Sequence, residues 1–179
     1  MKYYFNFYLF ILLISCSDQS SDCCDNKLRD AVIIDKGIYT VSYNELFEQP
    51  NWIEYEVSNR PKNVDRGNMD FYLESGIKTS DNDDYYKNPW DKGHLAPAAT
   101  FSDSQENLTK TFSFINCAMQ IDDLNRGEWA ELEQEVRDLS ALIGTIKVRI
   151  ELVFDPGHEI RETGVHVPTG FWKKLTFPS

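Results

Sequence analysis

Residues 91–133 constrain the fold of this chain more than any other part of its sequence. Their pattern predicts an extended segment, a loop, a second extended segment at residues 111–117 and then an amphipathic helix. The helix is indicated by apolar residues that recur every three or four positions and so share one face; these are Trp129, Leu132, Val136, Leu139 and Ile143. Gly144 marks its expected end, because glycine is common directly after a helix.

Polar residues in the same stretch suit a site for metal-assisted hydrolysis. His94 ends the first extended segment, Asn116 lies on the second, and Asn125 stands at the start of the helix with Glu133 eight residues further on. A neutral imidazole near a metal ion is suited to deprotonating water. The Asn116 amide could orient the His94 imidazole by hydrogen bonding.

Helix geometry separates the roles of Asn125 and Glu133. In a regular helix, eight residues bring two side chains within about 80° of each other and about 12 Å apart along the axis. That separation is too long for both to bind one ion directly, although side chains lean toward the helix N-terminus and shorten it. We therefore expect Asn125 to be a direct oxygen ligand and Glu133 to bind through water, which suits Mg²⁺.

The remaining pattern predicts an α+β domain with a central antiparallel sheet. A short helical turn is expected at residues 43–47, stopped by Pro50. Residues 78–89 are expected to form a solvated acidic loop, and His158 and His166 to have surface or packing roles. Strands are expected where residues are mainly apolar or alternate apolar and polar: residues 31–34, 38–43, 52–57, 146–154 and 164–175.

Composition indicates one folded domain and argues against general electrostatic binding of polyanions. The chain has 179 residues, of which 41% are hydrophobic, enough for a core. Its net charge of −11 lowers the expectation of nucleic-acid binding, because such proteins usually present a basic face. A local basic groove remains compatible with that total.

The first residues predict an export signal rather than part of the fold. Residues 1–16 place Lys2 before an apolar run that is too short to span a bilayer. The run ends in LISC, which resembles a bacterial lipobox, so Cys16 would be lipidated; an ordinary cleaved signal is the alternative. Residues 17–30 then predict a tether and residues 31–179 the folded domain. We expect an exported bacterial protein, either lipid-anchored in the cell envelope or periplasmic or secreted.

Three fragments of residues 91–133 together carry a family resemblance. They are DKGHLAPA at residues 91–98, Asn116 with Gln120, and LNRGEWAELE at residues 124–133. In this order and spacing they resemble the DNA/RNA non-specific endonuclease family, whose patterns are D-R-G-H-x-A-P-A, S-N-x-x-P-Q and L-N-x-G-x-W-x-x-L-E. The resemblance covers roughly residues 38–175 and implies a ββα-metal (His-Me finger) motif.

The resemblance implies a metal-dependent endonuclease that acts on DNA and RNA with little sequence preference. Carried over to this sequence, it makes His94 the general base that activates water. Asn125 becomes the direct ligand of Mg²⁺ (or Mn²⁺), while Glu133 binds the water shell of the metal. Asn116 supports the site near His94. An upstream arginine that stabilises the phosphate is matched by Arg66, with Arg60 as the alternative.

Several departures from the family pattern leave other functions open. Lys92 replaces an arginine, which keeps the charge but loses the bidentate fork, and Met119 and Ile115 replace a proline and a serine. The chain stops soon after FWKKL, which indicates a C-terminally shortened member with an exposed sheet edge. One alternative is therefore a catalytically impaired member that acts as an envelope surface or binding protein. Another is a phosphodiesterase for a small nucleotide.

Overall fold

A computed structural model describes residues 28–178 of the chain. The predicted signal at residues 1–16, with Cys16, and most of the predicted tether lie outside these residues. Arg29, which was assigned to the tether, already belongs to the folded part, because its guanidinium binds the Glu45 carboxylate at 2.6 and 2.9 Å. The contacts of the folded domain thus begin shortly before the expected boundary at residue 31.

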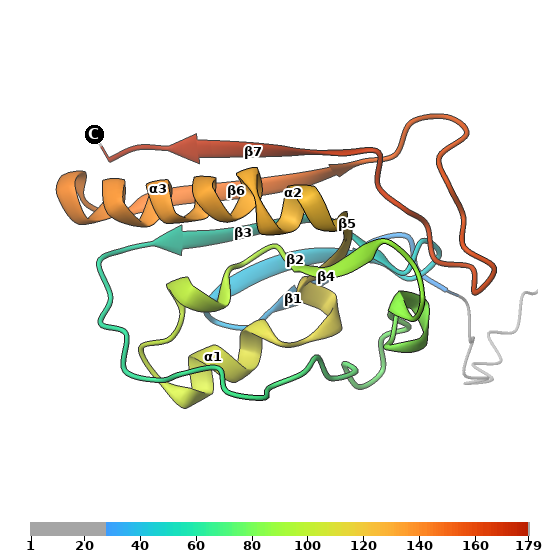
Figure 1. Ribbon diagram of the computed structural model, residues 1–179, viewed down its shortest axis with the longest axis horizontal. Coiled ribbons are helices and arrows are strands. Elements are labelled where there is room, and N and C mark those ends of the chain that lie inside the picture. Colours follow the sequence, from blue (N-terminus) through green and yellow to red (C-terminus); the bar gives the residue numbers. More distant parts are fainter. Residues whose placement is uncertain (1–27, 179) are drawn as a thin grey trace, which may run out of the picture.

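A five-stranded antiparallel sheet forms the larger layer of the fold (Figure 1). Its strand order is β1-β2-β3-β6-β7, so the two C-terminal strands extend a sheet that the first three begin. The strands are β1 Val32–Asp35, β2 Tyr39–Asn44, β3 Gln49–Val57, β6 Ile146–Val153 and β7 Gly170–Thr176. Every pairing is antiparallel, which confirms the predicted central sheet. β7 pairs only with β6 among the described strands.

A strand pair followed by helices forms the second unit. β4 (Trp90–His94) pairs antiparallel with β5 (Cys117–Ile121), and His94 stands opposite Cys117. Helices α2 (Asp122–Arg126) and α3 (Glu128–Ile143) follow β5 directly. The loop between β4 and β5 holds α1 (Gln105–Thr111) and two short 3₁₀ turns, Ala98–Thr100 and Phe114–Asn116. The predicted ββα motif is therefore present.

The expected single helix is interrupted at Gly127, between α2 and α3. Its backbone lies at φ −103° and ψ −112°, outside the helical range. A side chain is excluded there, because a Cβ atom would lie 2.6 Å from the Asp123 carbonyl oxygen. The regular-helix geometry predicted from Asn125 to Glu133 is consequently wrong, since the two residues belong to different helices.

Helix α3 packs on the large sheet through its predicted apolar stripe. Trp129 and Val136 are buried in one core with sheet residues such as Ile53 and Val148, and Leu132 and Leu139 pack against it. Ile143, at the helix end, is 44% exposed. Figure 1 shows α3 running along β6 and β7. This packing fixes one wall of the site on the sheet.

The expected helical turn at residues 43–47 is wrong. β2 continues to Asn44, whose side-chain oxygen accepts hydrogen bonds from Leu46 N (3.0 Å) and Phe47 N (3.1 Å). This local bond closes a turn in place of a helix. Pro50 lies inside β3 beside a bulge in the β2–β3 pairing, a place where a strand tolerates proline.

Two further predictions of local structure need correction. Residues 111–117 were expected to be a strand, but α1 ends at Thr111 and β5 begins only at Cys117. All seven residues are buried. Their apolar character therefore reflects burial and does not indicate a strand. The acidic loop at residues 78–89 is only partly solvated, because Thr79, Ser80 and Asp84 are buried. No helix within residues 28–178 is long and apolar enough to cross a membrane.

Candidate active site

A pocket of about 470 Å³ gathers most of the predicted site residues. His94 reaches it from the end of β4, Asn125 from α2, Glu133 from α3 and Arg66 from the loop after β3. Three of these elements form the ββα unit, so its packing sets the arrangement. Asn116 does not line the pocket.

The His94 imidazole is held between two aromatic rings that the sequence did not single out. Its centroid lies 4.6 Å from that of Phe71 and 4.8 Å from that of Phe112. Its Nε2 atom is buried and has no hydrogen-bond partner among the described residues. Burial, together with the nearby Arg66 charge, lowers the pKa of His94 to about 3. The ring is therefore neutral at physiological pH, which is the form in which an imidazole can act as a base.

Asn116 is fully buried and hydrogen-bonds backbone rather than the imidazole. Its Oδ1 accepts from Ala96 N at 2.7 Å, and its Nδ2 donates to Ala96 O (2.9 Å) and Thr111 O (2.8 Å). The predicted hydrogen bond from this amide to His94 is thus wrong, because both amide groups are already engaged. Asn116 instead fixes the chain two residues after His94, which holds the end of β4 in place.

The Asn125 amide is oriented by a carboxylate that the sequence reasoning left without a role. Its Nδ2 donates to Asp91 Oδ2 at 2.9 Å. Arg126 grips the same carboxylate with Nε at 2.7 Å and Nη2 at 2.5 Å. This pairing lowers the pKa of Asp91 and keeps it ionised. The amide oxygen of Asn125 makes no hydrogen bond with any described group, so it is available to a ligand.

Glu133 lies in an electrostatic setting that the sequence did not reveal. Burial raises the pKa of its carboxyl to about 7, against the lowering influence of the Lys173 and Arg137 charges. Lys173 comes from β7 and lies over the Trp129 ring at 4.5 Å. Its Nζ, like Nε and Nη1 of Arg137, is buried without a hydrogen-bond partner within residues 28–178. Only the tertiary fold brings β7 to this carboxylate.

Of the two candidate arginines, the structure places Arg66 at the pocket. Its guanidinium carbon lies 5.1 Å from the centroid of Phe112, next to His94, and the side chain is exposed. Arg60 pairs with Asp103 at 3.4 Å and does not line the pocket. The exposed guanidinium of Arg66 can therefore bind a phosphate that enters the pocket.

The two residues that precede His94, Lys92 and Gly93, each have a structural role. Lys92 forms an ion pair with Asp70 and donates to Asn82 Oδ1 at 2.9 Å, so its charge is already engaged. Gly93 lies so close to Gln120 that a Cβ atom would be 2.7 Å from Gln120 Cγ. A larger residue at Gly93 would push β4 away from β5 and displace His94.

The pocket residues fit a hard divalent cation. Such ions prefer oxygen ligands and retain water, and the pocket offers the unpartnered Asn125 oxygen and the Glu133 carboxyl. No group of three or more His, Cys, Asp or Glu side chains in the described part of the chain could hold a metal. The site proposed for this pocket differs from such a cluster, because it combines the Asn125 amide oxygen with the Glu133 carboxyl alone.

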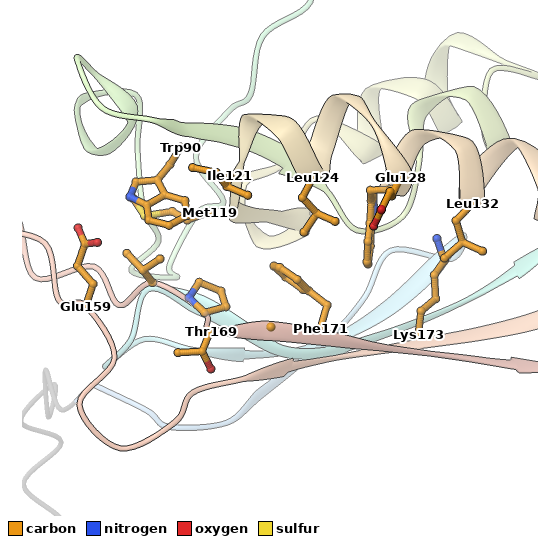
Figure 2. A pocket seen from close by; sticks show the side chains of 14 residues that line it. Trp90, Met119, Ile121, Leu124, Glu128, Leu132, Glu159, Thr169, Phe171 and Lys173 are labelled. Atoms are coloured by element: carbon orange, nitrogen blue, oxygen red, sulfur yellow. The ribbon is translucent and has the colours of Figure 1, made fainter.

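A second, larger cavity lies apart from these residues (Figure 2). Its volume is about 680 Å³ and its lining is mainly apolar, including Trp90, Leu124 and Phe171. It shares no residue with the His94 pocket. Figure 2 shows Lys173 at the end of this cavity nearest Leu132.

His158 and His166 lie outside both cavities and pack on each other. Their rings are joined by a contact of 2.6 Å between Nε2 of His158 and Nδ1 of His166. His166 also stacks on Phe47 with centroids 4.0 Å apart. This agrees with the packing role expected from the sequence.

The strand pair, the helices and the pocket together define a ββα-metal fold, with an imidazole at the end of its first strand and an amide on its first helix. The sequence model of DNA/RNA non-specific endonucleases matches residues 24–179, and the chain belongs to that family.

Individual relatives and a solved structure support the assignment. Mitochondrial endonuclease G of Bos taurus is 28% identical over 155 residues, which are 76% of this chain and 51% of that protein. A nuclease of Syncephalastrum racemosum is 31% identical over 116 residues, 60% of this chain and 36% of the relative. A crystal structure of an EndoG/EndoGI complex superposes with a TM-score of 0.74 at 28% identity, covering 81% of this chain and 67% of the other. The chain thus spans about half or less of these two relatives.

Proposed function

We propose that this chain is a Mg²⁺-dependent (or Mn²⁺-dependent) endonuclease that hydrolyses phosphodiester bonds of DNA and RNA with little sequence preference. One observation carries the proposal: a single pocket collects a neutral imidazole, an unpartnered amide oxygen, a half-buried carboxyl and an exposed guanidinium. These groups match what hydrolysis of a phosphodiester requires, namely a base, oxygen ligands for a cation and a positive charge for the phosphate. Membership of the family supports the same reaction.

The residues of the chain divide the work as follows. The neutral His94 imidazole accepts a proton from the attacking water. The Arg66 guanidinium binds a non-bridging phosphate oxygen and helps to neutralise the charge that grows on it. Asn125 would hold the cation directly and Glu133 through water; when bound, the cation supplies positive charge to the phosphate and the leaving oxygen. Asp91 keeps the Asn125 oxygen turned to the pocket, and Asn116 fixes the end of β4 behind the imidazole.

A plasmid-nicking assay tests this proposal. Supercoiled DNA and a structured RNA should both be cut in Mg²⁺ and not in EDTA, and His94→Ala should abolish cutting. His166→Ala is a matched control, because that histidine packs on Phe47 away from the pocket. Absence of metal-dependent cleavage in the wild type would instead favour the alternative, a catalytically impaired member that serves as an envelope surface or binding protein. Hydrolysis of dinucleotides without cutting of long strands would favour a small-nucleotide phosphodiesterase.

We further propose that the protein is exported and anchored in the bacterial envelope through lipidated Cys16. The support is the apolar run before LISC and the polar residues 17–27 that follow it. Growth with labelled palmitate should label the protein, and Cys16→Ser should prevent labelling and release the protein from the membrane fraction. Labelling of the Cys16→Ser variant would contradict this assignment.

A further inference from the structure

Two basic side chains without an ionic partner, Arg66 and Lys62, lie at or beside the His94 pocket. Most lysines and arginines within residues 28–178 pair with a carboxylate. Arg66 and Lys62 line adjoining hollows of the surface, and Arg137 and Lys173 act on Glu133. The basic residues that pair with no described carboxylate are Lys62, Arg66, Lys87, Arg137, Lys173 and Lys174. In a chain with a net charge of −11, two of these six side chains, Arg66 and Lys62, thus place unpaired positive charge at the pocket and beside it.

A second groove continues from the pocket on the side of Lys62. Its volume is about 410 Å³, and it shares Arg66, Ala98 and Ala99 with the His94 pocket. Lys62 and Asn63 line the groove but not the pocket. The shared residues make the two hollows neighbours, with Arg66 between them.

The walls of this groove are fixed by backbone hydrogen bonds. Asn63 N and Val64 N both donate to Ser102 O, at 2.9 and 3.0 Å, and Asn63 Nδ2 donates to Asp103 O at 3.1 Å. Asp65 is the one carboxylate in the lining, and its Oδ1 accepts from Gly67 N at 2.9 Å. The groove is therefore preformed, as binding sites usually are.

The lysine of the pocket lining is not free to bind a phosphate. Lys92 there is paired with Asp70, and its partner Asn82 stands among Asp81, Asp83 and Asp84. A phosphate would have to compete with Asp70 for Lys92, whereas Arg66 and Lys62 pair with no described carboxylate. The unpaired cations therefore favour the Lys62 groove as the path of the strand.

We propose that the Lys62 groove is a second phosphate subsite, which holds the strand of a nucleic acid beyond the bond to be cut. This inference rests on the proposed function for the identity of the pocket. Lys62 pairs with a phosphate next to the one that Arg66 binds, and its ammonium carries no base information, as a sequence-tolerant enzyme needs. The preferred substrate is therefore a strand of several nucleotides rather than a dinucleotide.

Binding of a fluorescein-labelled single-stranded oligodeoxynucleotide, measured by anisotropy in EDTA over a series of NaCl concentrations, tests the subsite without any cleavage. Loss of one phosphate contact to a single strand lowers the salt slope by about 0.7, equivalent to about fivefold weaker binding near 0.1 M salt. We expect this change in Lys62→Ala. Lys174→Ala is the control, since Lys174 is also unpaired but lies on β7 and lines neither hollow.

Kinetics separate failure of the subsite from failure of the proposed function. In Mg²⁺, Lys62→Ala should raise KM for the oligonucleotide, whereas Lys174→Ala should leave it at the wild-type value. The subsite is refuted if Lys62→Ala and Lys174→Ala bind the oligonucleotide with the same affinity and salt slope. A wild type that binds but never cleaves refutes the endonuclease activity alone.

Discussion

Asn125 donates its amide hydrogen to Asp91 Oδ2 at 2.9 Å, and this one bond decides which way the amide faces. With the nitrogen engaged, the oxygen is the atom left for a cation. Arg126 in turn holds the Asp91 carboxylate by two hydrogen bonds. Asp91 on β4 thereby orients the expected metal ligand, Asn125, on α2.

Asp91→Ala should weaken cation binding at Asn125 without unfolding the protein. Loss of a group that orients a metal ligand typically lowers metal affinity or activity by roughly ten- to a hundredfold. The Mg²⁺ concentration for half-maximal nicking should rise within that range. Asp138→Ala, which removes a carboxylate bound to Gln134 on α3, is the control and should behave as wild type. Equal Mg²⁺ curves for Asp91→Ala and wild type would contradict the orienting role.

Asn116→Ala should chiefly reduce stability. It removes three hydrogen bonds and leaves buried backbone groups of Ala96 and Thr111 unpaired, at a cost of about 2–4 kcal/mol. The free energy of unfolding in urea measures this. Asn68→Ala, at an exposed position, should change it by less than about 0.5 kcal/mol. A stable Asn116→Ala protein with lost activity would point to a direct part in the chemistry instead.

His94 should make the fold sensitive to acid. Burial lowers its pKa to about 3 in the folded chain, below the 6.5 of an unperturbed imidazole. Its contribution to stability is therefore complete above about pH 6.5 and is lost as the pH falls toward 3. At about pH 4.5 the wild type should have lost about 2–3 kcal/mol through this group. Urea unfolding of wild type and His94→Gln, compared at about pH 7.5 and about pH 4.5, isolates the part of the pH dependence that comes from His94. An unfolding free energy that falls equally in both proteins would show that His94 is not the cause.

Glu133 should cost stability above neutral pH. Burial raises its pKa to about 7, above the 4.5 of an unperturbed glutamic acid. Folding therefore favours the protonated acid, and this advantage disappears as the pH rises through 7. In EDTA, Glu133→Gln should therefore be more stable than wild type by about 1–3 kcal/mol at about pH 8, allowing for solvent screening, and equal to it at about pH 4.5. The variant should also lose nicking activity. Thermal unfolding at both pH values checks the prediction, and a less stable Glu133→Gln at the higher pH would oppose it.

The sequence predicts those parts of the site whose signals are local. The periodic stripe that contains Trp129 and Val136 identifies α3, and the motifs around His94 and Asn125 identify the pocket. Asn116 is found for the same reason, but its partners are wrong, because the choice between an imidazole and the backbone of Ala96 depends on a loop conformation that no pattern records.

The supporting contacts depend on the tertiary fold. Lys173 reaches Glu133 from β7, forty positions further along the chain, and Phe71 meets His94 from a loop with no regular structure. The break at Gly127 is also invisible to periodicity, since the apolar stripe begins only after it. Sequence patterns therefore find the reacting groups more readily than the residues that hold them.

Asn125→Ala tests the central claim most directly, because it removes the one amide oxygen that the pocket offers to a cation. Nicking of supercoiled DNA by wild type, Asn125→Ala and Asn125→Asp should be followed over a Mg²⁺ series that begins in EDTA. We predict no cleavage by Asn125→Ala and partial, metal-dependent cleavage by Asn125→Asp, which keeps an oxygen at this position. Cleavage by Asn125→Ala at the wild-type rate and with the wild-type Mg²⁺ curve would contradict the account.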